Sequence, residues 1–282
     1  MSNHNRKLLA VLAHPDDESF GMGGTLAYYA TQGVQVSLIC ATRGEVGEVP
    51  PENLKAFNTI AELREHELYC AAEKLGLTDV HFLDYRDSGM PGSPDNQHPN
   101  ALTAQPVELV AEKIAKQIRQ IKPQVVITFD PLGGYRHPDH IAIHRATVLA
   151  FEKSSDLKFR TENLPPYTPE RLYYHVMPKA SIRMMIKVMR LLGKDPQKWG
   201  SNKDIDLLSI AEAEFPIHAR INIRSVINKK EAAAACHDSQ GGGLFLGRLT
   251  KILMRLAAGE ETFMQAFPPV LQQGSAARDL FE

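Results

Sequence analysis

The stretch Lys7–Glu18, KLLAVLAHPDDE, joins an apolar segment directly to a polar turn. Its apolar part, Lys7–Ala13, is typical of a strand that is buried on both faces of a parallel sheet. Residues Gly21–Gln32 have the pattern of a helix that ends at Gly33. A second apolar run, Val34–Ala41, follows at once. This strand–helix–strand order predicts a right-handed crossover between parallel strands.

The same alternation continues to about residue 153. Periodicity predicts helices at Asn58–Leu75, Pro106–Ile121 and Pro138–Lys153, and strands at Val80–Leu83 and Val125–Phe129. We therefore predict an α/β fold, Rossmann-like and three-layered, in which a mainly parallel sheet has helices on both faces. Residues 1–153 form the predicted catalytic core, and residues 154–282 form a smaller C-terminal α+β extension that completes the domain and the substrate pocket.

The extension has a different rhythm. Strands are expected at Leu172–Val176 and His218–Ile223, and a helix at Val226–Cys236. A basic, Met-rich amphipathic helix is expected at Ser181–Leu192. Packing of this helix against the domain is favoured over a role at a membrane surface.

Composition restricts the class of protein. The chain has 282 residues, of which 43% are hydrophobic, and a formal net charge of −1. These values allow a sizeable core and argue against a constitutive nucleic-acid binder. No apolar run is long enough for a membrane helix, and the first residues do not read as a signal peptide, so we expect a cytoplasmic protein without stable membrane anchoring. A homo-oligomer stays open.

The chain has three cysteines: Cys40, Cys70 and Cys236. An odd, sparse set without a C-x-x-C pair is expected to be three reduced thiols. Cys40 lies in an apolar run and is expected in the core.

Polar and titratable segments follow the first four predicted strands: His14–Glu18, Thr42–Glu45, Asp84–Asp87 and Asp130–His140. The carboxyl ends of parallel strands meet at one edge of the sheet, where open α/β proteins bind ligands. The four segments should therefore converge on one crevice.

The first of these segments has the residue types of a metal site. His14 and Asp17 lie three residues apart on a tight turn, so both side chains can reach one ion, and histidine and aspartate are standard zinc ligands. Asp16 can then face the water-bearing position and take a proton from the bound water. The alternative is that these acids only cap the following helix, for which Glu18 is the best candidate.

The segment after the fourth strand supplies the remaining ligand. His140 is the predicted third zinc ligand. Asp139 is expected to orient His137 and to stabilise its protonated form, so that His137 stabilises an oxyanion and protonates a leaving amine. His144 lies one helical turn after His140, so spacing alone leaves His137 and His144 open as its partner.

Other classes of function fit the sequence less well. Gly21–Thr25, GMGGT, resembles a dinucleotide-binding turn superficially, but the turn itself carries carboxylates that would repel a phosphate. The chain has no G-x-S-x-G nucleophile elbow. A non-catalytic sugar-binding protein would not need the predicted base, and a metal phosphoesterase would favour more cationic groups or a second metal cluster.

At these residues the chain resembles the LmbE-like (PIG-L) family of zinc de-N-acetylases. The resemblance rests on the motifs AHPDDE at 13–18 and HPDH at 137–140, supported by TRGE at 42–45, ExRxxE at 62–67, YRDSGM at 85–90 and HDSQ at 237–240. It implies a Rossmann-like fold and deacetylation of N-acetylglucosamine derivatives. It also implies that zinc is held by His14, Asp17 and His140, that Asp16 is the base, and that His137 rather than His144 works beside them with Asp139. Iron could occupy the same ligands.

The resemblance is closest to the mycothiol-pathway branch, which contains a GlcNAc-inositol deacetylase and an amidase of thiol conjugates. It implies that Tyr135 polarises the amide carbonyl. It also suggests four contacts to a small amino-sugar conjugate: Glu45, Arg64, Asp87 and His237. Arg64 could instead form an exposed ion pair with Glu67, and His237 could instead cap the end of its helix.

Overall fold

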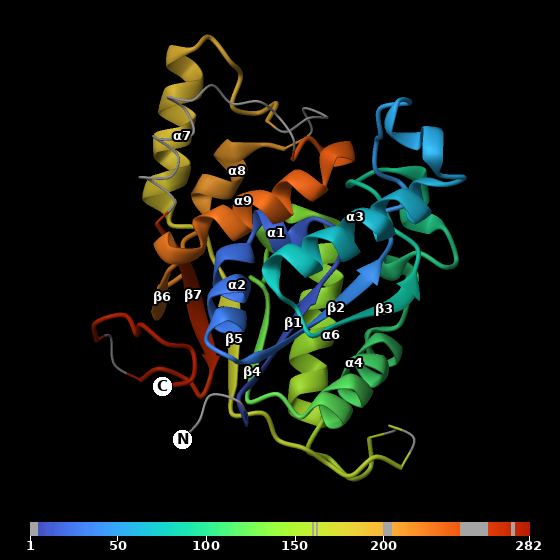
Figure 1. Ribbon diagram of the computed structural model, residues 1–282, viewed down its shortest axis with the longest axis vertical. Helices are drawn as coiled ribbons and strands as arrows, with labels where there is room; N and C mark the ends of the chain where they lie inside the picture. The colour runs from blue at the N-terminus through green and yellow to red at the C-terminus, as the bar shows by residue number, and fades with distance from the viewer. Residues whose placement is uncertain (1–4, 160, 162, 200–204, 243–258, 272–273) are drawn as a thin grey trace.

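The described residues form one sheet of seven strands: β1 (Lys7–Leu12), β2 (Gln35–Thr42), β3 (Asp79–Tyr85), β4 (Val125–Phe129), β5 (Arg171–His175), β6 (Ala219–Asn222) and β7 (Glu260–Phe267). The strand order is β3-β2-β1-β4-β5-β7-β6 (Figure 1). Strands β1 to β5 run parallel to one another, whereas β7 runs antiparallel to both β5 and β6. The structure is a computed structural model that describes residues 5–159, 161, 163–199, 205–242, 259–271 and 274–282.

Helices surround this sheet: α1 (Asp17–Phe20), α2 (Gly23–Thr31), α3 (Ile60–Leu75), α4 (Val107–Ile121), α5 (Gly133–Arg136), α6 (Pro138–Lys153), α7 (Lys179–Leu191), α8 (Leu207–Glu212) and α9 (Ile227–Cys236). Helices α2, α3 and α9 pack together on one face, and α4 packs against α6 on the other (Figure 1). Strands β1 and β4 are almost wholly buried between these layers, which explains why their sequences are continuous apolar runs. The predicted three-layer α/β fold is confirmed.

Capping residues and apolar runs in the sequence account for several of these helix and strand boundaries. Thr59 caps α3 by accepting from the backbone N–H of Glu62, and Gly76 ends the same helix in a left-handed conformation with φ of 80°. The predicted strand Val125–Phe129 and the predicted helix Pro138–Lys153 coincide with β4 and α6. None of the described helices is long and apolar enough to span a membrane.

Strand β7 was not expected from the sequence. It lies between β5 and β6, and it pairs antiparallel with both of them. Its sequence, EETFMQAF, lacks the continuous apolar run that marks β1 and β4, and five of its eight residues are partly or fully exposed. The division of the chain at residue 153 stays a prediction, but β5, β6 and β7 show that the later part extends the same sheet.

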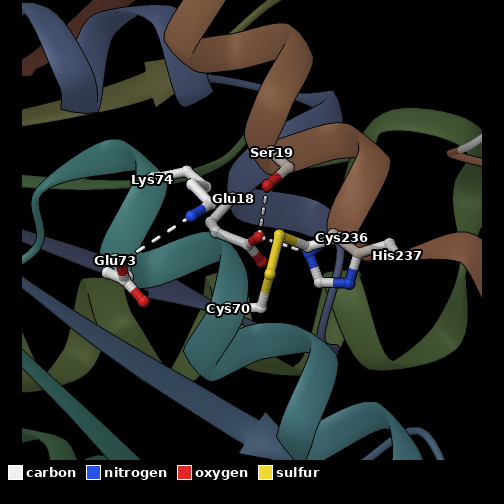
Figure 2. Close-up of a disulfide and its surroundings, with 7 residues drawn as sticks. All are labelled: Glu18, Ser19, Cys70, Glu73, Lys74, Cys236 and His237. Carbon is white, nitrogen blue, oxygen red and sulfur yellow. Dashed lines mark hydrogen bonds and ion pairs between the residues drawn. A yellow bond between two sulfur atoms is a disulfide. The ribbon is translucent and has the colours of Figure 1, made fainter.

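Two of the three cysteines are paired, so the expectation of three reduced thiols is wrong for Cys70 and Cys236. These residues form a disulfide between α3 and α9, with their Cα atoms 5.8 Å apart (Figure 2). They are separated by 166 positions in the sequence and come together only because α3 packs against α9. Cys40 is free and buried in the core, as predicted.

Removing the disulfide should lower the stability of the protein. The chain-entropy model gives about 5 kcal/mol as an upper value for closing so long a loop. The double variant Cys70→Ser/Cys236→Ser should therefore unfold at a lower urea concentration than the oxidised parent. A dithiol reductant should shift the parent to the midpoint of the variant and leave the variant unchanged. A parent whose midpoint does not respond to the reductant would contradict the stabilising role.

Candidate active site

The polar segments at the carboxyl ends of β1, β3 and β4 meet around His14. His14 begins the turn that joins β1 to α1, and its Nε2 lies 3.1 Å from Asp139 Oδ2 at the start of α6. The same nitrogen lies 3.5 Å from Asp87 Oδ1, in the segment after β3. All three side chains are buried. The predicted convergence at one edge of the sheet is therefore confirmed.

The other face of His14 forms a triangle of potential ligand atoms with Asp17 and His140. His14 Nδ1 lies 3.3 Å from His140 Nε2 and 3.6 Å from Asp17 Oδ2, and His140 Nε2 lies 3.2 Å from Asp17 Oδ1. Ligands about 2.0–2.1 Å from a tetrahedral zinc ion stand roughly 3.3 Å apart. The spacing and the donor types of these three residues thus fit a zinc ion.

Carboxylates around His14 determine which of its nitrogens can serve a metal. A metal-bound histidine usually donates its other N–H to a carboxylate, and here Nε2 faces Asp139. Asp139 Oδ2 is itself held by the backbone N–H of Ser88 at 2.9 Å. Although burial disfavours the charged ring, the carboxylates of Asp87 and Asp139 raise the pKa of His14 well above its usual value. The same negative field would stabilise a metal cation beside Nδ1.

The structure distinguishes the two histidines that spacing alone could not. One possible ligand atom from each of His14, His137 and His140 lies within 4.8 Å of the other two, so His137 borders the same space. His144 instead has Nδ1 at 2.8 Å from the backbone oxygen of Phe129, and its ring stacks edge-on against Tyr174. His144 is therefore a buried helix histidine.

The Asp139 carboxylate does not form the pairing with the His137 ring that the sequence predicts. The Asp139 carboxylate lies on His14, while the Asp139 backbone N–H donates to His137 Nδ1 at 3.2 Å. Burial, with positive charge on His14 and His140, lowers the pKa of His137 well below its usual value. Because Nδ1 accepts this hydrogen bond, Nε2 is the nitrogen left to act as a donor, and the imidazolium role expected for His137 stays a prediction.

Asp16 lies between His14 and Asp17 in the sequence and has a strained backbone conformation. Its φ of 124° and ψ of −29° are rare for a residue with a side chain, and such strain is characteristic of functional turns. Its carboxylate accepts from Arg64 Nη2 at 2.9 Å and stays partly accessible. Burial raises the pKa of Asp16 to about 6, although Arg64 opposes the shift. This is a suitable value for a base that operates near neutral pH.

Arg64 fixes the position of Asp16 from behind. Its side chain is only 3% exposed, and it also donates to the backbone oxygens of Pro15 at 2.6 Å and Gly44 at 3.0 Å. Gly44 has φ of +67°, and a Cβ there would lie 2.0 Å from Arg64 Nη1, so no larger residue fits. A direct contact between Arg64 and substrate stays a prediction.

The alternative of an exposed Arg64–Glu67 ion pair is wrong. Both side chains are buried, and Glu67 accepts from the backbone N–H of Ser239 at 2.8 Å and from its hydroxyl at 2.6 Å. Glu67 therefore binds the HDSQ segment to α3. Sequence reasoning assigned no role to Ser239, although the motif that contains it was visible.

Glu18 supports Asp16 from the other side. The Asp16 backbone N–H donates to Glu18 Oε2 at 3.0 Å, and His237 Nε2 lies 2.7 Å from Glu18 Oε1. Figure 2 shows Glu18 and His237 meeting beside the Cys70–Cys236 disulfide. His237 is 0% exposed and occupies the C-cap position of α9, so its observed role is to hold Glu18. Its predicted contact with substrate stays a prediction.

Tyr135 and Glu45 lie around the same site. The Tyr135 ring is 4.9 Å from the His140 ring and 5.8 Å from the His137 ring, and burial raises the pKa of its hydroxyl well above 10, so it stays protonated. Glu45 Oε2 accepts from the backbone N–H of Asp87 at 3.0 Å. Glu45 thus positions Asp87, which in turn faces His14.

The buried pair of Glu18 and His237 should stabilise the fold measurably. Removing one partner of a buried pair costs about 3 kcal/mol, so His237→Ala and Glu18→Gln should each lower the free energy of unfolding by about that amount. Burial disfavours a charged His237, but Glu18 raises its pKa above 6.5. The coupling free energy between Glu18 and His237 should therefore be complete below pH 6.5 and decline as the pH rises through the raised pKa of His237.

A double-mutant cycle in urea, repeated across this pH range, measures the coupling. His66→Ala, which removes an exposed histidine of α3, is the control and should change little. Additive effects of the two substitutions at low pH would contradict the pair.

Comparisons with known proteins agree with this geometry. The profile of the PIG-L family, described as GlcNAc-PI de-N-acetylase, matches residues 9–151. A relative from Acidothermus cellulolyticus, named 1D-myo-inositol 2-acetamido-2-deoxy-alpha-D-glucopyranoside deacetylase, is 39% identical over 244 residues, which are 83% of this chain and 80% of the relative.

Two solved structures share the fold at lower identity. The N,N'-diacetylchitobiose deacetylase from Pyrococcus horikoshii has a TM-score of 0.62 and 21% identity, covering 92% of this chain and 83% of its own. GalB, a 4-carboxy-2-hydroxymuconate hydratase from Pseudomonas putida, has a TM-score of 0.60 and 19% identity, covering 96% and 100%. The fold alone therefore hosts more than one reaction. The extent of the family match and the identity to the Acidothermus relative show that this chain belongs to the PIG-L family.

Proposed function

We propose that the chain is a zinc-dependent de-N-acetylase of a GlcNAc-inositol conjugate, with zinc held by His14, Asp17 and His140. The observation that carries this proposal is the triangle of ligand atoms 3.2–3.6 Å apart, with the strained Asp16 beside it. Hydrolysis of an N-acetyl amide on a GlcNAc-type conjugate follows from the family and from the names of the relatives. The inositol aglycone and the identity of the metal are the proposed part.

A zinc ion in this triangle would polarise the acetyl carbonyl and lower the pKa of a bound water. Asp16 is the proposed base that accepts the water proton. With a pKa of about 6, it is largely ionised at pH 7 and still basic enough to accept a proton. Arg64 and Glu18 hold its carboxylate and its backbone N–H, so the base needs little reorganisation during the reaction.

Tyr135 and His137 supply the hydrogen-bond donors for the oxyanion. The protonated Tyr135 hydroxyl donates to the oxygen of the acetyl group as negative charge develops there. His137, whose Nδ1 accepts from the Asp139 backbone N–H, would donate from Nε2 to the oxyanion. As the C–N bond breaks, the amine would take the proton that Asp16 accepted from the water, so that acetate and a free amine leave. Asp139 acts through His14 and through its backbone N–H on His137, which makes it a positioning residue.

The principal alternative is an amidase of thiol conjugates in the same family. The name of the Acidothermus relative favours deacetylation of a GlcNAc-inositol. A non-catalytic sugar-binding protein would have no need for the strained Asp16. A cytoplasmic location and a homo-oligomeric state stay predictions.

Substitution of the proposed base should separate catalysis from metal binding. Asp16→Asn should retain zinc but lower kcat by about 10²- to 10⁴-fold, because the amide cannot accept the water proton. Acetate release and zinc content by atomic emission measure the two properties. A rate equal to that of the parent would remove Asp16 from this role.

A matched pair of histidine substitutions tests the metal site. His140→Asn should lose bound zinc, while His144→Asn, one helical turn away, should retain it because His144 contacts only Phe129 and Tyr174. A chelator should inactivate the parent, and added zinc should restore it. Equal zinc content in both variants would exclude His140 as a ligand.

Substrate choice is tested by direct competition. The metal-loaded protein should release acetate from GlcNAc-inositol faster than it cleaves a thiol-conjugate amide, and it should not release phosphate from a generic phosphoester. A preference for the thiol conjugate would assign the chain to the amidase alternative.

A further inference from the structure

Helix α7 has two apolar faces, and only one of them packs against other parts of the chain that the structure describes. The inner face presents Ile182, Ile186 and Met189, all buried, to the cluster that contains Leu207 and Ile210 of α8. This confirms that the helix packs against the domain. One apolar stripe is sufficient for such packing.

The second apolar face points away from the core. Met184 is 61% exposed, Val188 is 45%, Leu191 is 86% and Leu192 is 68%. These positions, spaced by three or four residues, form one stripe of a helix. We call them the outer α7 face. A contiguous group of exposed large apolar side chains usually marks an interaction site.

Basic side chains border the outer α7 face. The exposed bases are Arg183, Lys187, Arg190, Lys194 and Lys198. Among the described residues, α7 forms a salt bridge only at its first turn, where Lys179 lies 3.5 Å from Glu214. The sequence from 179 to 199 contains a single acid, Asp195. The half-exposed Trp199 follows the last of these bases.

We propose that the outer α7 face docks reversibly on the surface of a bilayer that contains anionic phospholipid. An apolar stripe flanked by lysine and arginine is the pattern of a helix that lies in the interface, with its apolar side chains among the acyl chains and its bases at the headgroups. Tryptophan favours the same depth. The absence of a spanning helix among the described residues is consistent with peripheral, reversible attachment.

The basic charge of α7 favours an anionic bilayer over a second copy of the chain or the chain segment 243–258. A second copy of the chain docked through the same face would bring two basic surfaces together, which is unfavourable. The chain segment 243–258 contains Arg248, Lys251 and Arg255 and no acid, so it cannot neutralise α7. An anionic surface complements the charge and accepts the apolar stripe at the same time.

The position of α7 connects this surface to the active site. Tyr135 packs against the cluster formed by the inner face of α7 and by α8. Figure 1 shows α7 standing at one end of the molecule beyond α8. A small pocket between these helices and the loop after β4 is lined by Asp130, Gly134 and Ile182, among others. A docked enzyme would therefore hold this side of the site close to the bilayer.

Vesicle co-sedimentation tests the proposal with the full chain. The protein should sediment with phosphatidylglycerol/phosphatidylcholine vesicles, bind much less to phosphatidylcholine alone, and be released by high salt. Leu191→Glu/Leu192→Glu removes the apolar stripe, and Arg183→Glu/Lys187→Glu reverses two bases. Each double variant should weaken binding by at least about tenfold, because the first replaces apolar side chains that would enter the acyl region and the second replaces bases that attract the anionic headgroups.

The matched control is Leu157→Glu/Lys158→Glu, which changes an exposed apolar and basic pair in the loop after α6. It should bind vesicles like the parent. All variants should retain the circular dichroism spectrum and the rate of acetate release from soluble GlcNAc-inositol, so a failure to bind is distinguishable from a failure of the proposed reaction. Equal binding to both vesicle types, binding unaffected by the α7 variants, or a dimer that these variants dissociate would each overturn the proposal.

Discussion

His14 lies between two groups of carboxylates, and the active site depends on this contact. Asp139 and Asp87 face one of its ring nitrogens, while Asp17 and His140 face the other. So many buried polar groups are unfavourable unless each has a partner. Both ring nitrogens of His14 face a carboxylate, and the Ser88 backbone N–H binds Asp139 Oδ2, but Asp139 Oδ1 and His140 Nδ1 are buried without a hydrogen-bond partner among the described residues. A divalent cation would neutralise the excess negative charge.

The support for Asp16 comes from elements that are remote in the sequence. Arg64 on α3 holds its carboxylate, and Glu18, backed by His237 at the end of α9, holds its backbone. The disulfide joins those two helices one residue before His237. Catalysis by a strained residue requires such surroundings, because an unsupported backbone would relax to a lower-energy conformation. The C-terminal part of the chain therefore participates in the site through support rather than through direct contact.

The C-terminal part also adds elements around the parallel core. Strand β7 lies between β5 and β6 and pairs antiparallel with both of them. Helices α7 and α8 then cover the side of the site next to Tyr135. Such additions leave the chemistry of the core intact while changing what surrounds it, which is consistent with a fold that also hosts a hydratase.

The amino-acid sequence was sufficient to predict the parallel core and the location of the polar site. Continuous apolar runs such as β1 and β4 are typical of strands buried on both faces, and polar segments that follow parallel strands meet at one edge of the sheet. Hence the neighbourhood of His14, Asp17 and His140 was predictable, and so was the buried Cys40.

The pairing of individual side chains became visible only in the folded structure. The Asp139 carboxylate lies on His14 rather than on the neighbouring His137, whose Nδ1 accepts from the Asp139 backbone N–H. Arg64 and His237 are buried, where Arg64 binds Asp16 and His237 binds Glu18, and their contacts with substrate stay predictions. Cys70 and Cys236 are joined across 166 positions. Each of these contacts links residues through packing of helices or loops, and local sequence patterns carry no information about distances between segments far apart in the chain.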